Sequence, residues 1–207
     1  GDRTVADAFI YAADNGASIA QCSWCAPGGS FMSDSDYING IPSKKLDGSP
    51  LEYAAMQYFL DPKNSNCEGV ETNIAVFAAG NESALAAGYP SALPFCICVT
   101  AYGPDFLPGG YTNYGPGTNI TAPGGDSTYG TIMAVSSTSV EYAYSDGYEY
   151  MHGTSMATPH VSGCVALAIS YALKQGYHFT ATELTNILLT SVHDINQYMK
   201  GSRNYYD

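Results

Sequence analysis

The sequence has 207 residues, of which 45% are hydrophobic, so we expect one sizeable core and one domain or slightly less over residues 1–207. Charged residues make up 13%, about half the roughly 25% of ordinary soluble domains, and the chain holds 22 Gly and 18 Tyr instead. Such an uncharged, turn-rich composition is common outside the cell. With 19 acidic and 7 basic side chains the net charge is −12, which argues against nucleic acid or an anionic membrane as a partner.

The start of the chain indicates a piece of a longer polypeptide. It opens "GDRTVADAFIYAADNGAS", without an initiator Met and already inside a helix-like pattern. No charged-then-apolar leader is present, and no stretch approaches the roughly 20 apolar residues that cross a membrane. The lack of a leader carries little weight, because a leader could have been removed together with whatever preceded this segment.

The first half of the chain alternates helices with short apolar strands. Apolar side chains recur at helical spacing over residues 4–15, and Gly16 follows as a stop signal. A second helix is expected over residues 50–60, with Ser49 as its cap and Pro50 in its first turn. Continuous apolar strands are expected at residues 18–24, 72–80, 95–101 and 118–124. This alternation is typical of a parallel sheet covered on both faces, an α/β fold.

The second half is expected to hold a hairpin and two helices. Residues 132–137 and 148–153 read as the two strands of the hairpin, and residues 154–176 as a long apolar helix. An amphipathic helix over residues 180–192 is capped at Thr180 or Thr182. Ligands bind beyond the carboxyl ends of the strands in such sheets, so Ser23 and Asn81, which end two predicted strands, are expected to face one crevice.

The cysteines leave three interpretations open: buried free thiols, one or two disulfides, or a metal site. Zinc is the least supported, because Cys22-x-x-Cys25 has no matched second pair and Cys96-x-Cys98 has the wrong spacing. Period-2 geometry in the apolar run "FCICVTA" directs the last pair to one face of a strand, which favours burial. The six cysteines are Cys22, Cys25, Cys67, Cys96, Cys98 and Cys164.

Ser155, in the run "HGTSMATPHVSG", is the candidate nucleophile. Gly153 allows a tight turn, and the serine then stands at the start of a helix, where its own N–H is free and the dipole favours negative charge. Pro159 is tolerated near the helix start. A bare Gly-Thr-Ser is better explained as a simple helix cap, and it is the full run that favours a nucleophile.

Five blocks resemble the subtilisin-like serine proteases, the subtilases, in the family's order. "GTSMATPHVSG" is similar to the nucleophile motif, and "VFAAGNES" to the segment with the oxyanion asparagine. "SIAQCSW", "GYPSALPFCICVTA" and "YTNYGPGTNITAPGG" resemble the substrate-pairing strand, the Tyr-Pro wall and the turn before the active helix. The resemblance implies a three-layer α/β/α sandwich with a parallel sheet, Ser155 as nucleophile, and Asn81 as donor to the oxyanion.

The resemblance also implies a substrate cleft. A bound peptide would pair with the backbone of Ser23, Trp24 and Cys25, a form of strand addition. The side chain before the cut bond would enter a space whose small residues suggest room for a large apolar group. The residues implied to line that space are Ala78, Ala79, Gly80, Gly88 and Tyr89. The peptide bond before Pro90 is implied to be cis.

The proton acceptor is the part of the pattern that does not appear. The family's aspartate and histidine lie upstream of the helix with which this chain begins, and no His-Gly-Thr precedes Ser23. We therefore expect the C-terminal portion of a catalytic domain, truncated on its N-terminal side and inactive alone. Ser155 would keep only the modest help of binding and the oxyanion donors.

No histidine of this chain is expected to replace the missing base. His152 precedes Ser155 by three residues on a strand, so its ring is expected to point away. His160 lies about 140° around the helix and is expected to pack against the core or cap a strand. His178 follows Gly176 in a loop, and His193 lies near the end of the last helix.

Truncation would expose an apolar sheet edge and face, which invites pairing. The expected partners are therefore the missing N-terminal part of the same domain, a second copy in a homodimer, and a peptide or protein substrate. We expect a secreted endopeptidase of the extracellular space or cell envelope, with a non-catalytic peptide-binding or structural module, or an esterase, as alternatives. No cofactor is expected, although the resemblance raises calcium, for which the acidic loop at residues 33–36 is a poor candidate.

Overall fold

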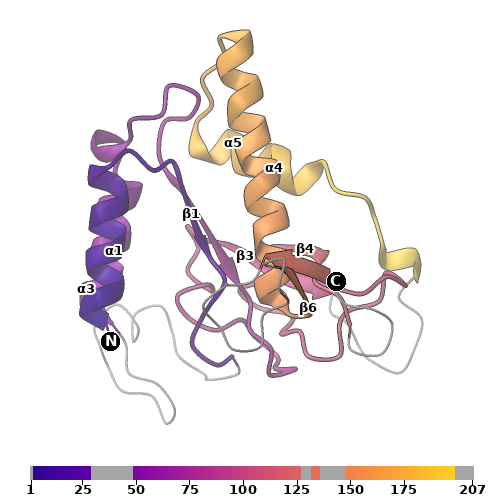
Figure 1. Ribbon diagram of the computed structural model, residues 1–207. Helices are drawn as coiled ribbons and strands as arrows, with labels where there is room; N and C mark the ends of the chain where they lie inside the picture. Colours follow the sequence, from indigo (N-terminus) through magenta and orange to yellow (C-terminus); the bar gives the residue numbers. More distant parts are fainter. Residues whose placement is uncertain (1, 29–48, 127–131, 136–147, 199–207) are drawn as a thin grey trace.

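The computed structural model describes residues 2–28, 49–126, 132–135 and 148–198. Four strands form a parallel sheet in the order β1-β2-β3-β4, so β1 and β4 are its edges among the described residues. Pairs of helices stand on opposite sides of these strands, α1 with α3 on one side and α4 with α5 on the other (Figure 1). The strands are β1 (Ile19–Cys22), β2 (Ile74–Ala78), β3 (Ile97–Tyr102) and β4 (Ile120–Pro123).

The predicted helices are present, and local sequence explains their ends. They are α1 (Asp2–Asp14), α3 (Pro50–Leu60), α4 (Thr154–Gln175) and α5 (Ala181–Thr190), with 3-10 turns at Pro62–Asn64 and Asn196–Tyr198. Ser49 caps α3 by accepting from the Glu52 N–H, and Gly176 ends α4 in the left-handed conformation. Thr180, not Thr182, caps α5, in a reciprocal capping box with Glu183.

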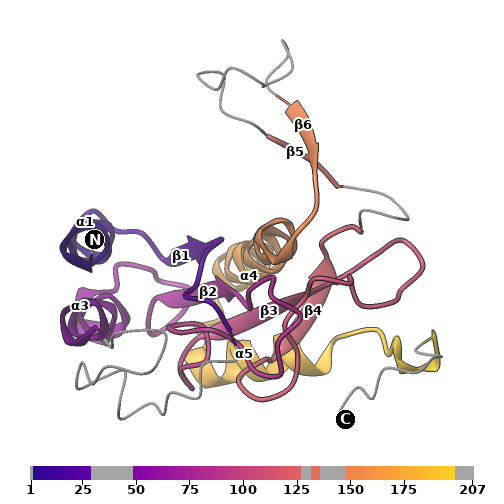
Figure 2. The ribbon, with the colours of Figure 1, turned by 90° about the horizontal axis from the view of Figure 1, so that it is seen from below.

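The predicted hairpin is confirmed: β5 (Ile132–Val135) pairs antiparallel with β6 (Tyr148–Met151). Figure 2 shows it extending away from the four-stranded sheet, next to the start of α4. β6 leads through two residues into α4, so the hairpin delivers the chain to the helix that carries Ser155.

The core has two parts, one on each face of the sheet. On the α1–α3 face, the rings of Phe9, Phe59 and Phe77 cluster, with centroids 5.9 Å and 6.3 Å from that of Phe9. On the other face, α4 contacts all four strands and places Val161 and Val165 on the sheet. The α/β/α sandwich expected from the sequence is therefore confirmed.

All six cysteines are free thiols, but the expectation that they are buried holds only for Cys22, Cys96 and Cys98. Cys25 and Cys67 are partly buried, and Cys164 is exposed. Cys96 and Cys98 are both buried: Cys96 belongs to the core on the α1–α3 side of the sheet, and Cys98 packs with Ala79 and Ala87. Burial and the neighbouring Cys25 raise the pKa of the Cys98 thiol well above its usual value, so it stays protonated.

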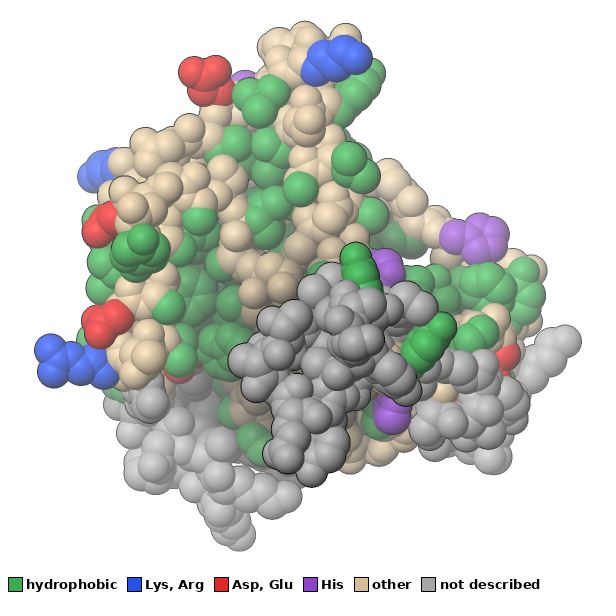
Figure 3. All heavy atoms as spheres, in the orientation of Figure 1, with side chains coloured by type: hydrophobic (Ala, Val, Ile, Leu, Met, Phe, Trp, Pro, Cys, Tyr) green, Lys and Arg blue, Asp and Glu red, His purple; other side chains and the backbone are tan. Residues whose placement is uncertain are grey.

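One face of α4 has no cover among the described residues. Leu167 is 73% exposed and Tyr171 60% exposed, and a side chain at Gly163 would meet open space. His160, Gly163, Cys164, Leu167 and Tyr171 follow helical spacing, so they form one stripe, which we call the open face of α4. Hydrophobic side chains along this helix are visible in Figure 3. The helix is long and apolar enough to cross a membrane by length and composition, yet its other face packs on the sheet.

The edge of β1 is open as well. A hollow of about 370 Å³ lies between α1 and β1, lined by apolar groups that include Val5, Phe9 and Trp24. β1 pairs only with β2 among the described residues, so its other edge offers unpaired backbone groups.

Candidate active site

Two serines join the end of β1 to the start of α4. The Ser155 hydroxyl donates to the Ser23 carbonyl oxygen at 3.0 Å, and the Ser23 hydroxyl donates to the Ser155 carbonyl oxygen at 2.7 Å. The Ser155 carbonyl oxygen is available to Ser23 because Pro159, four residues later in the helix, lacks the N–H that would otherwise donate to it. This pair of hydrogen bonds holds Ser155 beside Ser23, at the carboxyl end of the sheet.

Asn81 is fixed beside Ser155 through its side-chain oxygen. The Asn81 Oδ1 accepts from the Thr154 N–H at 2.9 Å and from the Thr154 hydroxyl at 3.0 Å. The Thr154 hydroxyl is fully buried and in turn accepts from the Gly80 N–H at 3.3 Å. Because both groups donate to Oδ1, the Nδ2 of Asn81 is left as a donor, with no partner among the described residues.

Gly153 leaves room between two free donors. Its φ of +150° favours glycine, and a Cβ at this position would lie 3.7 Å from both the Ser155 nitrogen and the Asn81 Nδ2. The Ser155 N–H is in the first turn of α4 and has no partner within the described residues. Two N–H donors without partners in the described part of the chain therefore border one space at the start of α4, and one of them belongs to the candidate nucleophile itself.

The predicted cleft residues come together around this corner. The Ala26 N–H donates to the Tyr89 oxygen at 2.7 Å, which ties the segment after Cys25 to the predicted wall. The Gly88 N–H donates to the Ala79 oxygen at 3.2 Å, and the Ser91 hydroxyl to the Ala78 oxygen at 2.6 Å. The Tyr89–Pro90 bond is cis, as the resemblance implied. The Trp24 ring lies edge-on against the Phe77 ring, with the two ring centroids 5.2 Å apart.

Asn113 is a buried organiser that sequence reasoning did not single out. Its Oδ1 accepts from the Glu82 and Ala84 N–H groups at 3.1 Å and 2.9 Å. Its Nδ2 donates to the Ala79 oxygen at 2.9 Å and to the Glu82 carboxylate at 2.7 Å, and that carboxylate also accepts from Gly28 N–H at 3.0 Å. The signal available was its place in "YTNYGPG", a block quoted for the resemblance without a role for the asparagine.

All four histidines lie within the described residues, and none is hydrogen-bonded to the Ser155 hydroxyl. The His152 ring packs on Tyr111 at 5.3 Å. The expectation that His160 packs against the core is wrong: it is exposed and bonds to the Met156 oxygen of its own helix at 2.8 Å. His178 bonds to the Glu68 oxygen at 2.8 Å. His193 is exposed and lies beyond the end of α5.

Two titratable side chains near the site, Cys25 and Tyr111, have raised pKa values. Burial, then the nearby Glu82 carboxylate, raises the pKa of the Cys25 thiol to about 11. Burial likewise raises the pKa of Tyr111 to about 12, and its hydroxyl contacts the Gly124 and Gly125 oxygens at 2.9 Å and 2.7 Å. Neither group can serve as a base at neutral pH.

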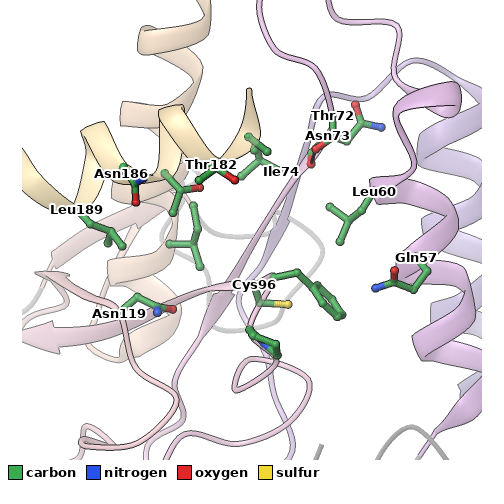
Figure 4. Close-up of a pocket in the computed structure, with 15 residues that line it drawn as sticks. Gln57, Leu60, Thr72, Asn73, Ile74, Cys96, Asn119, Thr182, Asn186 and Leu189 are labelled. Carbon is green, nitrogen blue, oxygen red and sulfur yellow. Dashed lines mark hydrogen bonds between the residues drawn. The ribbon is translucent and has the colours of Figure 1, made fainter. Parts of the chain in front are cut away.

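A cavity of about 530 Å³ lies at the other end of the strands, between α3, β2 and α5 (Figure 4). Asn73 and Cys96, which precede β2 and β3, line it together with Asn186 of α5. Its lining holds amides, hydroxyls and apolar groups but no carboxylate, amine or imidazole. It is therefore remote from Ser155 and lacks groups for acid–base chemistry.

No group of three or more His, Cys, Asp or Glu side chains that could hold a metal ion occurs among the described residues. The acidic loop at residues 33–36 lies outside those residues.

Comparison with known proteins agrees with this geometry. Halolysin of Haloferax mediterranei is 34% identical over 122 residues, 59% of this chain and 20% of the relative. The calcium-dependent protease of Trichormus variabilis is 30% identical over 186 residues, 82% of this chain and 27% of the relative. The chain thus spans about a fifth to a quarter of the length of these two relatives.

Solved structures show the same fold. The prenylagaramide maturation protease PagA matches with a TM-score of 0.69 and 23% identity, over 98% of this chain and 62% of its own. A cold-adapted subtilisin-like serine proteinase matches with a TM-score of 0.60 and 24% identity, over 92% of this chain and 54% of its own. The model of the subtilase family matches residues 1–205. This chain therefore belongs to the subtilase family.

Proposed function

We propose that the chain supplies the nucleophile, the oxyanion donors and the substrate strand of a serine endopeptidase. The observation that carries the proposal is the pair of donors at the start of α4, Ser155 N–H and Asn81 Nδ2, which have no partner among the described residues and border one space at Gly153. Attack of the Ser155 hydroxyl on a peptide carbonyl creates an oxyanion, and preorganised N–H donors stabilise it. Relatives that are named extracellular basic protease and calcium-dependent protease support the same reaction.

The base and its orienting acid would come from polypeptide outside residues 1–207. The Ser155 hydroxyl donates to a backbone carbonyl, which cannot accept its proton at neutral pH, so the hydroxyl stays a weak nucleophile. An imidazole brought to this oxygen would take the proton and pass it to the leaving amine. The chain alone is then a poor catalyst.

The open face of α4 and the free edge of β1 are where that polypeptide would pack. Both begin next to Ser155, because the Ser23–Ser155 hydrogen bonds join the end of β1 to the start of α4. We infer that the partner is the N-terminal part of the same domain, since the chain spans only 62% of PagA while PagA matches 98% of it. A homodimer through the β1 edge is the second candidate.

The proposal extends to the location of the protein and to whether it requires a metal ion. Relatives named extracellular proteases and the sparse charge of this chain support an extracellular or cell-envelope location. The proposed chemistry uses a hydroxyl and N–H donors and needs no cofactor. One relative is named a calcium-dependent protease, and comparing the melting temperature with calcium and with a chelator tests binding to this protein.

A non-catalytic peptide-binding module is the alternative, because the chain carries no base for Ser155. An active-site fluorophosphonate probe separates the two. We expect the full-length native protein to be labelled at Ser155, the Ser155→Ala variant to stay unlabelled, and residues 1–207 alone to react much more slowly. A folded full-length protein that is not labelled would refute the proposal that it is a serine protease. Turnover of esters without turnover of peptides would assign an esterase.

A further inference from the structure

We propose that the Cys25 side chain closes the space that receives the substrate side chain before the cut bond, and so restricts the enzyme to small residues there. The inference rests on the proposed function and adds its substrate class. Small residues on the facing segments had suggested room for a large apolar group. The position of one sulfur atom reverses that expectation.

The Cys25 sulfur lies close to two glycines of the predicted pocket, Gly80 and Gly88. A Cβ built on Gly80 would lie 3.2 Å from the Cys25 Sγ, and one built on Gly88 would lie 3.1 Å from it. Both distances are tighter than most real Cβ contacts, so the sulfur packs against the space that the missing side chains leave. The Asn113 amide lies closer still to the Cβ position on Gly80, and the Ala26 carbonyl oxygen to that on Gly88. The two glycines are therefore in contact with the thiol and do not border an empty slot.

Local structure directs the thiol inward. Side chains alternate along an extended segment, and Trp24 is held on one side by its edge-on contact with Phe77 at 5.2 Å. Cys25 then points to the other side, where its thiol is hydrogen-bonded to the Ser91 hydroxyl. The next residue is anchored by the Ala26 N–H bond to the Tyr89 oxygen at 2.7 Å. The sulfur is thus fixed from both ends.

The remaining side of Gly80 is occupied as well. The Glu82 carboxylate would lie 2.6 Å from a Cβ at Gly80, and its oxygen is held by the Gly28 N–H and the Asn113 amide. Because this carboxylate and the Cys25 sulfur both crowd Gly80, we expect a methyl or hydroxymethyl group to be accepted there more readily than an aromatic ring. The structure favours substrates with Gly, Ala or Ser before the cut bond.

The test is a specificity profile of the full-length native protein. Peptides that differ only in the residue before the cut bond (Gly, Ala, Leu or Phe) are compared by kcat/KM. We expect Ala to be preferred to Phe in the wild type. Cys25→Gly should raise the Phe-to-Ala ratio roughly 10- to 200-fold, the range that pocket volume supports in hydrophobic sites. Cys25→Ala should give a smaller shift and serves if Cys25→Gly does not fold.

Two control variants separate volume from thiol chemistry. Cys25→Ser keeps the size and should keep the wild-type ranking, and Cys67→Ala removes a thiol that packs against the α4–α5 core and should also keep it. A wild type that prefers Phe, or a folded Cys25→Gly enzyme with an unchanged ranking, overturns the inference. A folded protein that cleaves no peptide and takes no probe refutes instead the proposed function, and this inference with it.

Discussion

Replacing Thr154 by valine tests whether the donor corner is built as the geometry indicates. Valine has almost the same shape, so the change removes a hydroxyl without opening a cavity. That hydroxyl is fully buried, accepts from the Gly80 N–H at 3.3 Å and donates to the Asn81 Oδ1 at 3.0 Å. The Gly80 N–H would lose its partner in a buried place, which costs about 1–3 kcal/mol of unfolding free energy.

The same substitution should weaken catalysis, because Asn81 keeps only one of its two anchors, the Thr154 N–H. The loss of one hydrogen bond of about 0.5–1.5 kcal/mol corresponds to a roughly 2- to 12-fold slower reaction at Ser155. For a domain of this size, the stability loss should lower the melting temperature by roughly 2–12 °C. Differential scanning fluorimetry and the labelling rate of the fluorophosphonate probe measure the two effects on one preparation.

Thr158→Val is the matched control. Thr158 is also fully buried, one turn further along α4, but its hydroxyl donates only to the Thr154 carbonyl oxygen, at 2.7 Å. Its loss should lower stability by about 0.5–1.5 kcal/mol and leave the labelling rate unchanged. If Thr154→Val is labelled as fast as the wild type, or if both variants slow labelling equally, Asn81 is not positioned in the way we describe.

Three further changes extend the test. Gly153→Ala should destabilise by about 1–3 kcal/mol because of its φ of +150°, and should slow labelling at least as much as Thr154→Val, since the new methyl group intrudes between the two donors. Glu183 accepts from the Thr180 N–H and hydroxyl, which lowers its pKa, so its stabilisation is present at neutral pH and lost as the pH falls through its folded pKa. The difference in unfolding free energy between the wild type and Glu183→Gln, measured by urea unfolding at several pH values, should therefore become smaller in acid. A difference that grows in acid would contradict this reasoning. Leu167→Glu should leave the melting temperature of residues 1–207 nearly unchanged, because the side chain is 73% exposed, but should reduce their self-association in light scattering; a wild-type chain that is a stable monomer would contradict the expectation that the exposed apolar surface of residues 1–207 drives self-association.

The elements that sequence patterns predicted well are those whose ends are decided locally. Ser49 and Pro50 mark the start of α3, and the threonine and glutamate three residues apart at Thr180 and Glu183 form the capping box of α5. Buried parallel strands are continuous apolar runs, so β2 and β3 were found within a few residues. The strands came out shorter than expected because pairing partners, which lie far away in the chain, decide where each ladder stops.

The site was less accessible to sequence reasoning, because its decisive contacts are long-range. Ser23 and Ser155 are 132 positions apart, and nothing in either segment indicates that their hydroxyls and carbonyls bond reciprocally. Asn113 reads as one turn residue among several, yet its amide holds the loop of Glu82 in place. The size of the predicted pocket also depends on long-range contacts, since the glycines that suggested space lie close to the Cys25 sulfur, which comes from a distant segment of the chain.

The two halves of the proposed chemistry are fixed by different means. The groups that would donate to the oxyanion are fixed by short-range contacts. Gly153, Thr154 and Ser155 are consecutive in the chain, and the buried Thr154 hydroxyl holds Asn81 against them. In the enzyme that we propose, the proton-accepting half would arrive across the β1 edge and the open face of α4, on which Leu167 and Tyr171 are exposed. Burying that apolar stripe on association would drive the docking, at about 25 cal/mol per Å² of apolar surface. Activity should therefore follow the integrity of this packing surface, so that a substitution on α4 far from Ser155 silences the enzyme while the oxyanion corner stays intact.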